Sequence, residues 1–220
     1  MKINYLMAVL FITGYLECNS TNISYKINGI ETVLVQDNIL NLKVDAIVNA
    51  ANKNLEHGGG ICDVIHKAAG PELEKECLKY PLLGQDTRCY TGQAVITKGY
   101  DLKNCKSVIH AVGPDWRASN TSVAPVLLGN AYLSSLELAD KNKLSSIAFP
   151  AISVGIFAFP PKKATEIAVK TIANFDYSKS YIKKIYFVVY NDNNLFEFYK
   201  NVLEKYDEKY QERLSPISKL

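Results

Sequence analysis

Two glycine-containing segments have the composition of phosphate-binding loops. The first, Gly-Gly-Gly at residues 58–60, directly precedes residues with helical periodicity. Glycines let a backbone approach a ligand closely, and the start of a helix presents free N–H groups and a positive dipole to an anion. The second segment, residues 153–157, offers further backbone N–H groups. Tight turns explain either segment taken alone, but two such loops that face each other would suit a diphosphate.

Two asparagines and two aromatic residues accompany these segments. Asn49 and Asn52 follow a short apolar run. An amide side chain donates and accepts hydrogen bonds, which suits sugar hydroxyls, although turn formation and helix capping also explain asparagines here. Phe157 and Tyr190 end a loop and a predicted strand. Each could stack on a base or a ribose, or close the core.

Several functional classes are excluded by motif and composition. Neither glycine segment matches the NTPase pattern Gly-x-x-x-x-Gly-Lys-Ser/Thr or the dinucleotide pattern Gly-x-Gly-x-x-Gly. The 220 residues are 48% hydrophobic and 21% charged, which is typical of a globular chain. A formal net charge of +3 is too weak to indicate duplex nucleic acid as a partner. No apolar run reaches the roughly 18 residues that would span a bilayer.

The cysteines and histidines form no metal-binding pattern. No CxxC pair occurs, and the number of cysteines is odd, with irregular spacing. Free thiols in a reducing compartment are therefore expected. The residues concerned are Cys18, Cys62, Cys77, Cys89 and Cys105, with His57, His66 and His110.

Strand and helix patterns alternate from residue 23 onward. This alternation predicts an α/β fold in which a largely parallel or mixed sheet lies between helices on both faces. Ligands bind such folds at the carboxyl ends of the strands, where residues 49–60 and 153–157 are expected to lie. Asn28-Gly29 predicts a hairpin turn. Strands are predicted at 23–27, 30–35, 44–48, 94–97, 107–112, 146–151 and 184–190, and helices at 61–69, 72–79, 126–140, 163–175 and 195–210.

The two ends of the chain lie outside this pattern. Residues 1–22 contain an uncharged apolar stretch at 6–16, followed by the small residues Cys18 and Ser20, as in a signal peptide. An extra strand or a disordered leader on a cytosolic domain is the alternative. Asn-x-Ser/Thr sequons begin at Asn19, Asn22 and Asn120. Residues 212–220 are expected to be a frayed tail.

Five blocks of sequence resemble the macrodomain, an ADP-ribose-binding module, and the resemblance covers about residues 23–206. The blocks are residues 44–52, 58–71, 91–97, 108–114 and 149–157, in family-like order and spacing. The similarity is closest to the branch that hydrolyses ADP-ribosyl and O-acyl-ADP-ribose esters. It implies a three-layer α/β/α fold with a central mixed, largely parallel sheet over residues 23–211.

The resemblance also implies partners and a location. ADP-ribose or an ADP-ribosylated protein is the expected partner of a monomeric domain, with no cofactor and no metal. Esters of ADP-ribose belong to intracellular chemistry, which favours the cytoplasm. Secretion remains the alternative if residues 1–20 are a signal peptide.

Family roles carry over onto matching positions of this chain. The implied catalytic residues are Asn52, which would hold the distal ribose, Asn49, which would support it, and Cys62 and Asp63 at a helix start. The first glycine segment and the Ser153 segment would bind the diphosphate, Phe157 would contact the distal ribose, and Tyr190 would stack near adenine. The adenine amino group would be bound by Asp37 or by Asn38. The implied ligand-binding residues are Asp37, Asn38, Ile39, Gly58, Gly59, Gly60, Ile61, Ser153, Val154, Gly155, Ile156, Phe157, Tyr190 and Asn191.

Cys62 departs from the pattern of the family. Many hydrolytic members have an aspartate at this position, although some viral members with hydrolase activity have a cysteine. Asp63 follows, but one helical step turns a side chain by about 100°, so Asp63 need not point into the cleft. A thiol at a helix N-terminus can have a lowered pKa, which raises the hypothesis of a nucleophile beside that of a passive lining residue. Hydrolysis is the expected function, and a non-catalytic reader of ADP-ribosylated proteins is the alternative.

The histidines have separate expected places. His57 would touch the distal ribose or lie in solvent. His66 would share a helical face with Cys62 but lie farther from the cleft. His110, in the middle of an apolar run, is expected to be a hydrogen-bonded core histidine.

Overall fold

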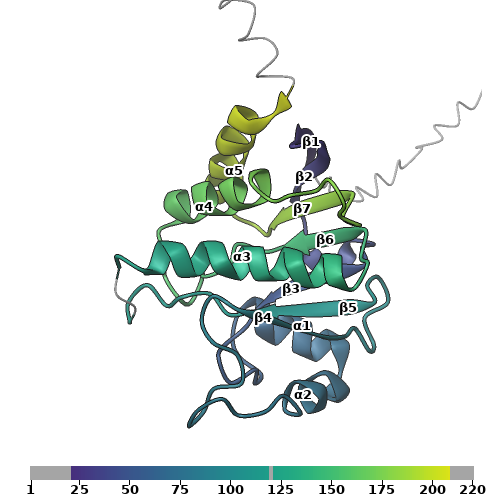
Figure 1. The fold of residues 1–220 in the computed structure, drawn as a ribbon, viewed down its shortest axis with the longest axis vertical. Coiled ribbons are helices and arrows are strands. Elements are labelled where there is room, and N and C mark those ends of the chain that lie inside the picture. The colour runs from purple at the N-terminus through teal and green to yellow at the C-terminus, as the bar shows by residue number, and fades with distance from the viewer. Residues whose placement is uncertain (1–20, 119–120, 209–220) are drawn as a thin grey trace, which may run out of the picture.

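A seven-stranded mixed sheet forms the middle layer of the computed structural model, which describes residues 21–118 and 121–208 (Figure 1). The order across the sheet is β1-β2-β7-β6-β3-β5-β4. β1 and β4 run antiparallel to their neighbours, and the other pairs are parallel. The strands are β1 Thr21–Ile27, β2 Ile30–Gln36, β3 Ala46–Ala50, β4 Ala94–Lys98, β5 Ser107–Ala111, β6 Ser146–Phe149 and β7 Lys184–Val189.

Helices cover both faces of the sheet, as predicted. Three of them, α3 to α5, lie together over one face, and α1 and α2 lie on the other (Figure 1). None of the helices in the described ranges is long and apolar enough to cross a membrane. The helices are α1 Ile61–Ala69, α2 Pro71–Cys77, α3 Ala124–Lys141, α4 Pro161–Ala173 and α5 Asn193–Tyr206, with a 3-10 turn η1 at Ile39–Asn41. The predicted three-layer α/β/α class is confirmed.

Some element boundaries differ from the prediction. β1 begins at Thr21, two residues early, so most of the predicted leader and the whole predicted tail lie outside the described residues. β6 ends at Phe149 rather than at residue 151, because Pro150 has no N–H to donate to a neighbouring strand. The last helix ends at Tyr206, not at residue 210. The hairpin turn is as predicted, with positive φ at Asn28 and Gly29.

Strand β3 has the predicted length but begins and ends two residues later than predicted, so it contains Asn49. Side chains alternate between the two faces of a strand. Val48 therefore packs in the core under α3 to α5, while Ile47 packs against α1 and α2. Asn49 points to the same side as Ile47, into the buried layer beneath α1, instead of standing free at the end of the strand.

The carboxyl ends of the parallel strands meet along one edge of the sheet. Asp37 follows β2, Tyr190 follows β7 and Pro150 follows β6, and these three strands lie next to one another. Ala51 follows β3 on the other side of β6. The chain thus places both predicted loops at the edge where α/β proteins bind ligands.

Asp45 ties together the opposite edge, where β3, β5 and β6 begin. Its carboxylate accepts hydrogen bonds from the N–H and the hydroxyl of Ser145 at 2.9 and 2.6 Å, and from Lys106 Nζ at 3.0 Å. Partial burial opposes ionisation, but the hydrogen bonds from Ser145 and Lys106 outweigh it and hold the pKa of Asp45 well below its usual range.

We expect the substitution Asp45→Asn to lower the free energy of unfolding at pH 7 by about 1–3 kcal/mol, since it removes the negative charge and replaces one of the two acceptor oxygens with a donor. A carboxyl with a depressed folded pKa stabilises above its unfolded pKa and loses this effect as the pH falls. The difference from the wild type should therefore shrink below about pH 4. Urea unfolding at pH 7 and pH 3 measures it, with the exposed Asp86→Asn as control. An equal difference at both pH values would contradict the assignment.

Candidate functional site

Two adjoining cavities lie along the carboxyl edge of the sheet. The asparagine cavity, about 230 Å³, contains Asn52 and Phe157 in its lining. The tyrosine cavity, about 480 Å³, contains Asp37 and Tyr190. They share lining residues and so form one elongated cleft. The shared residues are Gly60, Ile61, Ala151 and Gly155.

The first glycine segment leads into α1 at the middle of the cleft. Gly60 has φ 63° and ψ −133°, a conformation that is essentially restricted to glycine. Within the described residues, the N–H groups of Gly59, Gly60 and Ile61 donate no hydrogen bond. They belong to the start of a helix, where unpaired N–H groups favour an anion.

The second segment faces the first across the cleft. A Cβ atom on Gly59 would lie only 2.8 Å from Ile156 Cδ1, so the two loops approach each other at this point. The N–H groups of Gly155, Ile156 and Phe157 likewise have no acceptor in the described parts of the chain. The predicted pair of opposed, amide-rich loops is therefore present.

The other two residues of the second segment differ: Ser153 lines the asparagine cavity, and Val154 does not. Ser153 has φ 67°, unusual for a residue with a side chain, and its buried hydroxyl has no partner in the described structure. Val154 was predicted to contact ligand but lines neither cavity. It packs against the core, and its N–H donates to Ala151 O at 3.3 Å.

Asn52 combines the two roles that its residue type suggests. Its Oδ1 accepts from the N–H groups of Asn54 and Glu56 at 3.1 and 3.2 Å, which closes a turn. Its Nδ2 donates to Glu56 O at 2.8 Å. An amide nitrogen has two protons, so one remains for a ligand in the asparagine cavity.

Cys62 lines the asparagine cavity, but its thiol is not activated. Burial raises the pKa of the Cys62 thiol and outweighs the hydrogen bonds from Asn49 and from the N–H of Gly58. The possibility of a lowered pKa is thus wrong for this structure, because desolvation dominates over the helix start. The Sγ atom lies 3.7 Å from Glu56 O, to which the thiol donates.

Asp63 lies outside the cleft, as the helical step allowed. Its carboxylate pairs with Lys67 Nζ at 2.8 Å and with His57 Nε2 at 2.7 Å. The hydrogen bonds from Lys67 and then His57 lower the pKa of Asp63. Neither Asp63 nor His57 lines a cavity, so the predicted catalytic place of Asp63 and the ribose contact considered for His57 have no support in the geometry.

Asn49 is fully buried behind the cavity wall instead of lining it. Its Nδ2 lies 3.1 Å from His110 Nδ1 and 3.5 Å from Cys62 Sγ. The predicted support of Asn52 by Asn49 is therefore indirect. His110 is fully buried and hydrogen-bonded, and burial lowers its pKa to about 3, as expected for a neutral core histidine.

Besides Gly60, Ile61 and Gly155, which it shares with the asparagine cavity, the tyrosine cavity gathers four further predicted ligand residues. Asn38 Oδ1 caps η1 by accepting from the N–H of Leu40 at 3.0 Å. Asp37 Oδ1 accepts from the N–H of Asn38 and from Asn41 Nδ2 at 2.6 and 2.8 Å. The lining residues Ile39 and Tyr190 complete the group. Asn191, which was also predicted, lines neither cavity.

Several lining residues escaped the prediction. They are small or aliphatic, and they come from the ends of strands and the inner faces of helices, where hydrophobic periodicity indicates core packing and not contact with a ligand. Their only signal was closeness to the motifs. These residues are Ala50, Val64, Pro150, Ala151, Val188, Val189 and Leu195.

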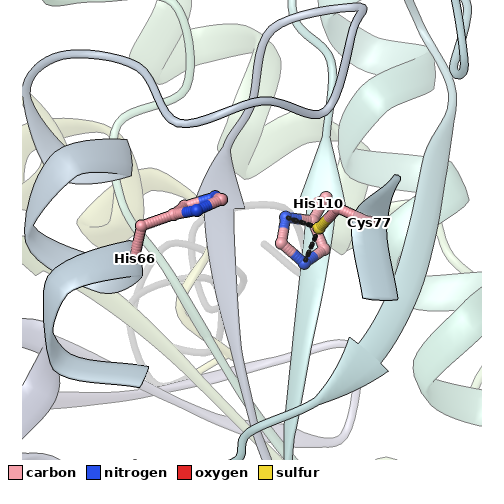
Figure 2. A group of neighbouring side chains, drawn as sticks. All are labelled: His66, Cys77 and His110. Carbon is pink, nitrogen blue, oxygen red and sulfur yellow. Dashed lines mark hydrogen bonds between the residues drawn. The ribbon is translucent and has the colours of Figure 1, made fainter. Parts of the chain in front are cut away.

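Behind the cleft, His66, Cys77 and His110 form a buried group whose ligand atoms lie within 4.8 Å of one another (Figure 2). Cys77 Sγ lies 3.5 and 3.9 Å from the two ring nitrogens of His110. Those nitrogens already pair with Asn49 Nδ2 and, at 2.9 Å, with Thr97 Oγ1. Since both in-plane positions of His110 are occupied, the arrangement suits a hydrogen-bonded core better than a metal centre.

Comparison with known proteins agrees with the geometry. The Macro domain family model matches residues 48–168. The O-acetyl-ADP-ribose deacetylase of Escherichia coli (strain K12) is 44% identical over 175 residues, which are 80% of this chain and 97% of that protein. The protein of the same name from Escherichia fergusonii is 48% identical over 161 residues, 73% of this chain and 89% of that one.

Solved structures give the same family. A structure of the Oceanobacillus iheyensis macrodomain with ADP has a TM-score of 0.76 at 34% identity and covers 84% of this chain and 96% of that one. The Trypanosoma brucei macrodomain in complex with ADP-ribose has a TM-score of 0.67 at 33% identity and covers 77% and 68%. This chain belongs to the macrodomain family, and the predicted membership is confirmed.

We expect Gly60→Ala to weaken the binding of ADP-ribose about tenfold or more, because alanine resists the backbone conformation at residue 60 and shifts the N–H groups of the loop. Calorimetric titration measures the affinity. Gly84→Ala is the matched control, since Gly84 has no positive φ and open space around its Cα. Unchanged affinity in a folded Gly60→Ala variant would contradict this role of the loop.

Proposed function

We propose that this macrodomain binds ADP-ribose along the cleft and hydrolyses an ester at its distal ribose, with O-acetyl-ADP-ribose as the first substrate to test. The observation that carries the proposal is the pair of opposed loops with free N–H groups between two cavities. An ADP-ribose molecule has the matching order of parts: a nucleoside, a diphosphate and a second ribose. The relatives named O-acetyl-ADP-ribose deacetylase support the choice of ester.

The nucleoside fits the larger, tyrosine cavity. Tyr190, 67% exposed at its rim, offers a face on which adenine can stack. The adenine amino group is a donor and needs an acceptor. Asn38 uses its Oδ1 for the cap of η1, whereas Asp37 Oδ2 has no partner in the described structure. We therefore assign this contact to Asp37.

The distal ribose and its ester fit the asparagine cavity. Asn52 Nδ2 would donate to the ribose, and Phe157 would pack against it. In the hydrolysis of O-acetyl-ADP-ribose, water adds to the acetyl carbon, the ester C–O bond breaks, and the ribose hydroxyl is restored as acetate leaves. No carboxylate or imidazole occurs among the described side chains that line this cavity. The water must then be positioned by backbone groups and by the phosphates of the ligand itself.

Asn52→Ala should reduce turnover far more than Cys62→Ala. The amide of Asn52 acts where charge develops, and loss of one such donor costs about a hundredfold or more in kcat. The buried, protonated Cys62 contributes only through the weak hydrogen bonds of its sulfur with Glu56 O, Asn49 and Gly58, so its loss should cost about threefold to fivefold. Cys62→Asp should increase turnover, because it adds a carboxylate at the cavity.

Release of acetate from O-acetyl-ADP-ribose by each variant measures these effects, with ADP-ribose affinity determined in parallel so that lost binding is not mistaken for lost catalysis. An inactive Cys62→Ala together with an active Asn52→Ala would overturn the assignment and favour a covalent cysteine. Binding without turnover of this ester or of a mono-ADP-ribosylated protein would favour the non-catalytic reader.

The place of action and the state of assembly are part of the proposal. We assign the protein to the cytoplasm because the free cysteines of the described residues, three of them buried, suit a reducing compartment. We also propose that it acts as a monomer. N-terminal sequencing of the protein from its own cell tests the location. A mature start near residue 19 or 21 would establish secretion instead.

A further inference from the structure

A chain of hydrogen bonds connects the outer strand β4 with the wall of the asparagine cavity. Thr97 Oγ1 lies 2.9 Å from His110 Nε2, and His110 Nδ1 lies 3.1 Å from Asn49 Nδ2. Thr97, His110 and Asn49 are all buried, on the same side of the sheet. They come from three neighbouring strands, β4, β5 and β3.

The donors along this chain can be assigned from its outer end. We assign the hydroxyl proton of Thr97 to Lys98 O, 3.2 Å away, because a carbonyl oxygen can only accept; Thr97 Oγ1 then accepts from His110. This assignment places the proton of the neutral imidazole on Nε2, which also lies 3.5 Å from Cys77 Sγ. Nδ1 is left as an acceptor, and it receives an N–H of Asn49. Thr97 therefore sets the tautomer of His110, and His110 sets the orientation of the Asn49 carboxamide.

The same chain continues to the cavity. Asn49 Nδ2 lies 3.5 Å from Cys62 Sγ, the Cys62 thiol donates to Glu56 O, and that same carbonyl oxygen accepts from Asn52 Nδ2 at 2.8 Å. The Oδ1 atom of Asn49 is buried without a partner in the described structure. If the proton of His110 moved to Nδ1, the carboxamide would turn over to present this oxygen, and the contact with Cys62 would be lost.

We propose that Thr97 and His110, which line neither the asparagine cavity nor the tyrosine cavity, are positioning residues. They fix the Asn49 carboxamide and, through it, Cys62 and the Glu56 carbonyl that holds Asn52. The positioning role itself does not depend on the proposed function; only the expected effect on turnover rests on it. The neighbouring Cys77 and His66 belong to the same buried layer (Figure 2). A metal held by His66, Cys77 and His110 would need a ring nitrogen of His110, and both of these nitrogens are already hydrogen-bonded to Asn49 and Thr97.

The test compares Thr97→Val with Thr97→Ser in the full-length protein. Valine keeps the shape of threonine but offers no acceptor, whereas serine keeps the hydroxyl. NMR spectra of ¹⁵N-labelled histidines should show His110 with its proton on Nε2 in the wild type and in Thr97→Ser. In Thr97→Val the proton should move to Nδ1. A wild-type His110 protonated on Nδ1 would overturn the proposal without any variant.

Turnover gives the second readout. Thr97→Val should lower kcat about threefold to fivefold, as for Cys62→Ala, with KM and ADP-ribose affinity unchanged. Thr97→Val and Cys62→Ala interrupt the same series of hydrogen bonds. The double variant with both substitutions should therefore be no slower than either single variant. The proposal would be overturned if the decrease in kcat of the double variant equalled the product of the two single decreases, or if Thr97→Val had a normal kcat. One equivalent of zinc bound by the purified protein through His110 would do so as well.

A protein without any turnover would refute the proposed function but not this inference. The rate at which iodoacetamide alkylates Cys62, followed on its own peptide by mass spectrometry, then replaces kcat. That rate should differ between Thr97→Val and the wild type and be unchanged in Thr97→Ser. An equal rate in all three proteins would overturn the positioning role.

Discussion

The meeting of parallel strand ends along one edge of the sheet is the constraint on which the site depends. Strands β2, β7, β6 and β3 all run in the same direction, so the segments that follow them must share one edge. Each segment leaves the sheet there and no longer has a neighbouring strand to satisfy its backbone. Free N–H groups accumulate at this edge, and the cleft between the two loops is where they remain unpaired. Anion binding therefore follows from topology before any charged side chain is considered.

Burial then decides what the side chains at this edge can do. The start of α1 would favour a thiolate at Cys62, yet removal from water raises the pKa of the thiol more strongly than the local N–H groups lower it. At Asp63, one residue further on, an exposed carboxylate takes Lys67 and His57 as partners and stays ionised. Two adjacent positions on one helix thus differ in chemistry because one faces the cavity wall and the other faces solvent.

Much of the fold and of the site could be predicted from the sequence, since hydrophobic periodicity and the residue types of turns are local properties. The strand and helix pattern, the Asn28-Gly29 hairpin and the composition of each loop depend on residues close together in the chain, whereas the resemblance to the macrodomain implied that the two loops bind one diphosphate. What failed were properties that depend on distant residues. The direction of Asn49 follows from the alternation of β3 and the place of His110 on β5, and the packing of Val154 follows from the core beneath its loop. The thiol pKa of Cys62 likewise depends on how deeply the fold buries it.

Backbone N–H groups and the side-chain amide of Asn52 at the cleft are held in place in different ways. Backbone N–H groups can bind a diphosphate without help, because the fold fixes their directions. A side-chain amide such as Asn52 can rotate, and its orientation has to be set by other bonds. Its turn fixes Oδ1, while the carbonyl of Glu56 fixes Nδ2 and is shared with Cys62. Buried polar residues behind the cavity wall cost stability unless they are paired. Here their hydrogen bonds lead from Asn49 through Cys62 and Glu56 O to the amide of Asn52, which lines the asparagine cavity.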